Sequence, residues 1–227
     1  MDSTRFILVN TSHPGNVGST ARAMKVMGFS DLVLVAPRFP DVLVQEETVA
    51  MASGAADILV RARIVPTLTE ALDGVTFACA TAMTPRDFGP PTRAPRELLP
   101  ELAAGGHRVG FVFGSERYGM SNEDVYRCHA CLSIPTHPDY GSLNLAQAVQ
   151  LLAYDWRQAL GGFPVVSRAA AAQAPPAVAR ILVVLAAAAA VARGPAACSR
   201  SRSRSRSWRR RSSGPAGRRR CGRGARP

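Results

Sequence analysis

Six short apolar runs alternate with segments of helical periodicity along the first 160 residues. The runs cover residues 6–9, 32–35, 62–65, 75–81, 109–113 and 131–134. Most of them are continuously apolar, which is typical of strands that are covered on both faces. Between them the sequence predicts helices over residues 18–28, 46–53, 68–72, 97–102 and 122–127. This alternation predicts an α/β fold, a mainly parallel sheet flanked by crossover helices.

The last predicted helix has the clearest pattern and marks the end of the folded body. Leu145, Val149, Leu152 and Trp156 recur at helical spacing after Ser142, which we expect to be the N-cap. A Gly-Gly-Phe-Pro segment then ends the helix, and the composition changes. We therefore expect a catalytic domain over residues 1–163, an Ala/Pro-rich linker or partial helix over 164–198, and a disordered Arg/Ser-rich tail over 199–227.

Charge divides the chain at the same place. All 16 acidic residues lie within residues 1–155 beside 12 Lys or Arg, whereas the other 72 residues contain 16 Arg, no Lys and no acid. The basic tail therefore accounts for the net charge of +12. Such a tail resembles a GC-rich gene read in a shifted frame, and the abrupt loss of acidic residues favours this reading. The alternative is a basic arm that binds RNA phosphates.

Other features of the composition bear on the compartment. The start of the chain has no secretory signal pattern, and the apolar run over 181–192 is too short to span a bilayer. The five cysteines have no framework spacing, which indicates reduced thiols. Cys128 and Cys131 have no second pair with which to form a zinc site. We expect a cytoplasmic protein that binds neither membranes nor metal.

A glycine-containing segment from His13 to Arg22 follows the first strand. It resembles a nucleotide-phosphate loop but lacks the lysine of a Walker loop and one glycine of the dinucleotide pattern. One interpretation is an ordinary turn in which Gly15 and Gly18 permit unusual backbone angles. Arg22 favours a functional interpretation, because an arginine one turn inside the helix can bind a phosphate through two hydrogen bonds.

Two further polar segments follow later strands. Gly114 ends a buried strand, where it either lets a flat ligand approach the backbone or serves only the turn. Ser142 and Asn144 precede the last helix and form a polar cradle with its first amides, although a plain N-cap would explain Ser142 alone. Because loops at the carboxyl ends of parallel strands converge, we expect all three segments to surround one ligand.

Taken together, the three segments resemble the motifs of the SpoU branch of the SPOUT RNA methyltransferases. The matching residues are Asn16-Val-Gly18 with Arg22, Gly114-Ser-Glu116 and Ser142-Leu-Asn144. The sequence around the first motif is similar to that of the family members that methylate the ribose of the pyrimidine at tRNA position 32. The resemblance implies an S-adenosylmethionine-dependent 2′-O-methyltransferase that acts on tRNA. The alternative substrate is rRNA. It also implies a C-terminal trefoil knot and an active site completed across a homodimer.

The resemblance also assigns roles to individual residues. It implies cofactor contacts at Thr81, Ala82, Met83, Gly114, Ile134, Gly141, Ser142 and Leu143. Around the ribose it places Asn16, Arg22, Glu116, Ser142 and Asn144. Arg22 is the residue implied as base, but a guanidinium stays protonated, so we favour a role in orienting phosphate and hydroxyl. Two alternatives are a non-catalytic RNA-binding homologue and a Rossmann-type nucleotide-binding enzyme.

Overall fold

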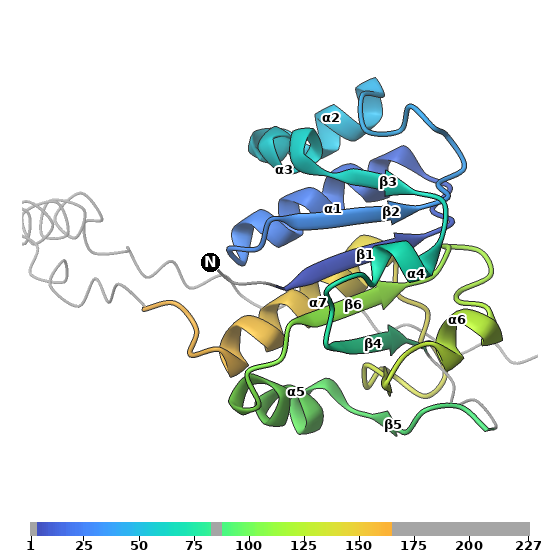
Figure 1. Cartoon of the computed structure of the whole chain (residues 1–227). Helices are drawn as coiled ribbons and strands as arrows, with labels where there is room; N and C mark the ends of the chain where they lie inside the picture. Colours follow the sequence, from blue (N-terminus) through green and yellow to red (C-terminus); the bar gives the residue numbers. More distant parts are fainter. Residues whose placement is uncertain (1–3, 83–87, 165–227) are drawn as a thin grey trace, which may run out of the picture. The chain divides into compact units, whose positions relative to one another are not determined.

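The computed structural model describes residues 4–82 and 88–164, all within the compact unit Met1–Val165. Seven parallel strands form one sheet in the order β3-β2-β1-β6-β4-β7-β5 (Figure 1). The strands are β1 (Arg5–Val9), β2 (Asp31–Val35), β3 (Arg63–Val65), β4 (Phe77–Thr81), β5 (Thr92–Arg93), β6 (Val109–Phe113) and β7 (Ala130–Leu132). The predicted parallel α/β fold is confirmed.

Helices cover both faces of this sheet. They are α1 (Pro14–Val26), α2 (Glu46–Ala52), the 3-10 turn η1 (Ser53–Ala55), α3 (Ala56–Arg61), α4 (Leu68–Ala71), α5 (Pro95–Ala104), α6 (Asn122–Tyr126) and α7 (Leu145–Ala159). Phe6 and Leu8 of β1 face a core built with α1, α2, α3, α5 and α7, whereas Ile7 and Val9 face one built with α4 and α6. Successive strand residues are thus buried on opposite faces, which explains the continuously apolar runs.

Two helix starts differ from the prediction. Helix α1 begins at Pro14, with His13 as its N-cap, four residues before the predicted start at Gly18. Proline suits the first helical position because the amide there has no partner within the helix. The N-cap of α7 is Asn144, not Ser142: its side chain accepts from Ala146 N, and Gln147 Oε1 accepts from Asn144 N in a capping box.

Two short elements were not predicted from the sequence. Helix α3 has six residues and follows η1 directly, and its N-cap residue, Ala55, has no polar side-chain group to accept a hydrogen bond from the first turn. Strand β5 has only two residues, Thr92 and Arg93, directly after a pair of prolines. A strand of two residues is too short to display a hydrophobic period, and the positions of both elements depend on the neighbouring chain.

The glycines of the first motif serve helix packing. A Cβ atom at Gly18 would collide with the carbonyl oxygen of Thr48 and would lie 2.9 Å from the amide nitrogen of Ala52, both in α2. At Gly15 it would lie 2.6 Å from a carboxylate oxygen of Glu47. Neither glycine is among the residues with positive φ. The interpretation as a turn with unusual backbone angles is therefore wrong, and at Gly18 the close approach of the α2 backbone is what requires a glycine.

Several predictions concern residues that the structure does not describe. Met83 and almost all of the predicted linker and tail, residues 165–227, lie outside the described ranges. The boundaries of the domain, linker and tail therefore stay predictions. Within residues 4–82 and 88–164, none of the helices has the length and apolar character needed to cross a membrane.

Candidate functional site

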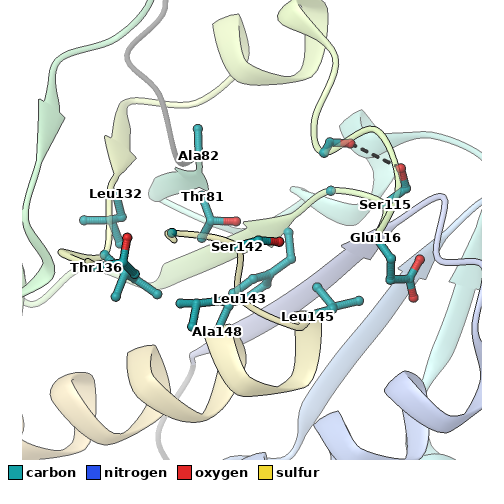
Figure 2. A pocket seen from close by; sticks show the side chains of 15 residues that line it. Thr81, Ala82, Ser115, Glu116, Leu132, Thr136, Ser142, Leu143, Leu145 and Ala148 are labelled. Atoms are coloured by element: carbon teal, nitrogen blue, oxygen red, sulfur yellow. Dashed lines mark hydrogen bonds between the residues drawn. The ribbon is translucent and has the colours of Figure 1, made fainter. Parts of the chain in front are cut away.

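A cavity of about 260 Å³ lies where β4, β6 and β7 end. Its walls come from the ends of these strands, the loops that follow β6 and β7, and the first turn of α7 (Figure 2). Every predicted cofactor residue that the structure describes lines it, namely Thr81, Ala82, Gly114, Ile134, Gly141, Ser142 and Leu143. The loops after three strands therefore converge, as the parallel topology requires.

Other lining residues were missed by the sequence analysis. Leu132, Thr136, Leu145 and Ala148 contribute to the wall, and Figure 2 shows them around Ser142 and Leu143. Leu132 ends β7 and Thr136 lies in the loop beyond it, so their position after a predicted strand was a usable signal. Leu145 and Ala148 are three residues apart on one face of α7. The wall combines apolar side chains with hydroxyl groups, a mixture typical of small-molecule sites.

The loop after β6 folds back on itself. Ser115 N donates to Gly119 O at 3.0 Å, and Gly119 N donates to Ser115 O at 2.9 Å. A Cβ atom at Gly114 would collide with the backbone of Gly119 and Met120. The absence of a side chain at Gly114 is therefore required by the turn, although its backbone also lines the cavity. The turn alone therefore explains the glycine, and the approach of a ligand to its backbone stays a prediction.

A chain of hydrogen bonds connects the three motifs. Glu116 accepts from Thr11 Oγ1 at 2.8 Å and from the backbone and hydroxyl of Ser12 at 2.9 and 2.8 Å. Asn16 Nδ2 donates to the same carboxylate at 3.0 Å. The side chain of Asn144 then donates to Asn16 Oδ1 at 2.9 Å. Residues about one hundred positions apart thus form one polar network.

The environment of Glu116 determines what this carboxylate can do. Partial burial raises its pKa, but hydrogen bonds from Asn16 and from the backbone and side chain of Ser12 outweigh that effect and bring the pKa to about 2. The group is therefore ionised at neutral pH, and neutral donors occupy its oxygens. A carboxylate with so low a pKa is a weak base, and its hydrogen bonds fix the loop that carries Asn16.

Arg22 lies apart from the cavity. Its side chain is exposed and lines a second hollow between α1, α2 and α7. The hollow is formed by Ser19, Arg22, Ala23, Val26, Ala50, Met51, Asn144, Ala146, Gln147 and Gln150. Of the predicted ribose-binding residues, Glu116 and Ser142 line the cavity, and Asn16 joins the network. Asn144 belongs both to the network and to the hollow that holds Arg22.

Known proteins with similar sequences cover the body of the chain. The SpoU rRNA Methylase family matches residues 3–154. TrmJ of Pseudomonas aeruginosa, named tRNA (cytidine/uridine/adenosine-2′-O-)-methyltransferase, is 49% identical over 164 residues, which are 70% of this chain and 62% of TrmJ. TrmJ of Photorhabdus laumondii is 45% identical over 163 residues, which are 70% of this chain and 66% of that one. The chain thus spans slightly less than two thirds of the length of these relatives.

Solved structures agree with this relationship. A probable methyltransferase from Bordetella pertussis is 49% identical with a TM-score of 0.66, and the match covers 70% of this chain and 96% of that one. TrmJ from Z. mobilis is 37% identical with a TM-score of 0.64 and 68% coverage of both chains. The family match covers well over half of the sequence and includes all three motifs around the cavity. The chain belongs to the SpoU rRNA methylase family.

Proposed function

We propose that this protein is an S-adenosylmethionine-dependent RNA 2′-O-methyltransferase whose target is the pyrimidine ribose at tRNA position 32. The observation that carries the proposal is the convergence of the three motifs on one cavity and one polar network. The names of the TrmJ relatives, which describe tRNA 2′-O-methyltransferases, support tRNA as the substrate. Because tRNA is the substrate, we also propose the cytoplasm as the place of action.

The lining of the cavity fits the proposed cofactor. Leu132, Ile134 and Leu145 provide apolar surface suited to a purine ring, whereas Thr136 and Ser142 provide hydroxyl groups for a ribose or amino-acid moiety. When bound, S-adenosylmethionine supplies a methyl group activated by a positively charged sulfur. A Rossmann-type enzyme is less well supported, because Gly18 lies against the backbone of α2 and neither Gly15 nor Gly18 lines this cavity.

The protein's own contribution to the reaction is alignment. With the cofactor bound, the ribose 2′-oxygen would form a bond to the methyl carbon, the carbon–sulfur bond would break with its electrons left on sulfur, and the hydroxyl proton would leave. Holding the hydroxyl in line supplies much of the acceleration in such a transfer. Glu116 is occupied by neutral donors, so we assign the proton to an RNA phosphate or a water molecule. Arg22 orients the phosphate and the hydroxyl.

The location of Arg22 supports a homodimer as the active form. In one chain this arginine lines the hollow between α1, α2 and α7 and not the cofactor cavity. Two exposed apolar side chains line that hollow, Val26 at 57% and Met51 at 49% exposure. We propose that two copies pack through these helices, which carries Arg22 to the partner's cavity. Sedimentation equilibrium tests this directly, and the mass of a single chain at micromolar concentration would overturn it.

The trefoil knot is also part of the proposal. Strand β7 lies between β4 and β5, which are consecutive in the chain and both precede it. Such an insertion supports a crossing of chain segments in the C-terminal part of the domain. The loop after β7 lines the cavity, so the segments involved in this crossing would also contribute to the methyl-donor site.

Methyl transfer itself is the decisive experiment. The full chain is incubated with tritiated S-adenosylmethionine and unmodified tRNA, and the methylated nucleotide is mapped after nuclease digestion. We expect label on the 2′-oxygen at position 32. Binding of S-adenosylhomocysteine without transfer would make the protein a non-catalytic homologue. Binding of NAD or ATP in its place would favour the Rossmann-type enzyme.

Arg22→Lys tests the orienting role. Lysine keeps the charge but provides only a point contact, so we expect turnover to fall by about tenfold or more while S-adenosylhomocysteine binds as before. Arg61→Lys is the matched control, because Arg61 pairs with Asp57 on α3. Full turnover by Arg22→Lys would refute the requirement for two-point orientation.

A further inference from the structure

Arg38 and Arg117 are two of several exposed arginines that form no ion pair with a carboxylate among the described residues; Arg22 and Arg108 are others. Most basic side chains in residues 4–82 and 88–164 form ion pairs with a carboxylate, namely Arg5, Lys25, Arg61, Arg63, Arg93, Arg96 and Arg127. Arg38 and Arg117 form none in that part of the chain, and both are exposed. Their charge is therefore available to a partner that is not part of this chain.

The sheet brings these two arginines to the same edge. Arg38 comes three residues after β2, and Arg117 comes four residues after β6. Strands β2, β1 and β6 are neighbours and run parallel, so their arrowheads point to one edge in Figure 1. Two strand spacings separate the loops by about 10 Å at the sheet. The loop that follows β1, which binds Glu116, lies between them.

Each guanidinium is also supported by an aromatic ring next to it in sequence. Arg38 lies 5.2 Å from the ring centroid of Phe39, and Arg117 lies 5.3 Å from that of Tyr118. Stacking of this kind restricts the side chain while its N–H donors stay available for a second contact. The restriction lowers the entropic cost of binding an anion at either position.

The backbones that carry this pair are fixed as well. The amide of Arg38 donates to Thr11 O at 2.9 Å, which ties the loop after β2 to the residue that binds Glu116. Arg117 lies inside the turn closed by the two Ser115–Gly119 hydrogen bonds. Tyr118 in the same turn is 79% exposed, which leaves one side of its ring for a stacked base. The two cations are thus held at defined positions on either side of the polar network.

We propose that Arg38 and Arg117 form an arginine pair that contacts successive parts of a single-stranded RNA backbone and draws the target nucleotide across the site. This inference rests on the proposed function and names the side chains that hold its substrate. A guanidinium binds a phosphate through two hydrogen bonds, and single-stranded loops are the RNA elements whose bases can be splayed out and stacked. The exposed ring of Tyr118 beside Arg117 fits such a loop.

The salt dependence of tRNA binding tests the arginine pair. Equilibrium binding of the full chain to unmodified tRNA is measured at several potassium chloride concentrations for wild type, Arg38→Ala, Arg117→Ala and the double variant. The logarithm of the binding constant falls with the logarithm of the salt concentration, and loss of one phosphate contact makes this slope shallower by about 0.7–0.9. We expect that decrease for each single variant and about twice as much for the double variant. The basic tail contributes equally to all four proteins.

Arg61→Ala is the control, because it removes an exposed arginine that is already paired with Asp57. We expect it to leave the slope unchanged. If Arg38→Ala and Arg117→Ala have the same slope as Arg61→Ala, the inference is overturned. Methyl transfer by the wild-type preparation is measured in parallel. If the wild type turns over but the slopes of the variants are unchanged, only the inference about the arginine pair is overturned. If the slopes become shallower but the wild type does not turn over, RNA contact by the pair is supported and the proposed catalytic function is overturned.

Discussion

Replacing Glu116 with glutamine removes one charge from the centre of the polar network. The two carboxylate oxygens accept from Thr11, Ser12 and Asn16. A glutamine amide has one oxygen and one NH₂ group. The NH₂ group would therefore face hydrogen-bond donors that now bind a carboxylate oxygen. An unpaired backbone amide or hydroxyl in a partly buried position costs roughly 1–3 kcal/mol. We therefore expect Glu116→Gln to destabilise the loop after β1.

The pKa of Glu116 gives an independent magnitude. A decrease from the usual 4.5 to about 2 corresponds to at most about 3 kcal/mol of stabilisation of the folded state. The side chain is only partly buried, so solvent screening reduces this to roughly 1–2 kcal/mol. Both arguments agree on the size of the expected change in the free energy of unfolding at neutral pH.

The sign of the pH dependence follows from the same shift. Because the folded pKa is lower than the unfolded one, the stabilisation is fully present above about pH 4.5 and is lost as the pH falls towards 2. Glutamine does not titrate in this range. The difference between wild type and Glu116→Gln is therefore largest at neutral pH and shrinks as the solution is acidified.

Urea unfolding followed by circular dichroism at several pH values measures this difference. Glu97→Gln is the matched control, because Glu97 is exposed in the first turn of α5 and its carboxylate makes no hydrogen bond with the described residues. We expect the control to change stability by less than about 0.5 kcal/mol. A difference below that limit for Glu116→Gln, or one that stays constant from pH 7 to pH 3, would refute the reasoning.

Two further predictions concern the packing that positions the site. Gly18→Ala places a methyl group against the backbone of Thr48 and should destabilise the protein by about 3 kcal/mol in urea unfolding, whereas Gly54→Ala, with no atom within 4 Å, should be neutral or slightly stabilising. Equal effects of the two changes would contradict the close helix contact. Trp156→Phe removes a 2.7 Å hydrogen bond to Thr4 in the core and should cost roughly 1–3 kcal/mol by the same assay; a change under 0.5 kcal/mol would show that the bond is not needed.

The pattern of apolar residues was sufficient for the sheet but not for its shortest parts. Runs such as Val109–Phe113 identify strands because burial on both faces leaves no polar position. The same reasoning has no signal for β5, whose two residues pair only with β7. The order of the strands also depends on contacts between distant segments, which periodicity does not reveal.

The roles of individual residues within the motifs were harder to predict. The sequence pattern favoured Ser142 as the N-cap, and only the hydrogen-bond geometry of the first turn identifies Asn144 instead. Gly18 precedes its contact with Thr48 by thirty positions, so the sequence gives no sign that helix packing requires a glycine there. Likewise, the four positions between Gly18 and Arg22 do not reveal that the Arg22 side chain lines the hollow between α1, α2 and α7 and not the cavity.

The side chain of Asn144 uses both ends of its amide, the oxygen towards the start of α7 and the nitrogen towards Asn16. Position 144 therefore tolerates only a short side chain that carries an acceptor and a donor together. Aspartate would satisfy the helix and leave the fold intact, yet it would present an oxygen to the oxygen of Asn16. Under the proposed function, the side-chain oxygen would serve the fold and the nitrogen would serve the connection between motifs, so a screen for folded variants would retain sequences in which the motifs are no longer connected.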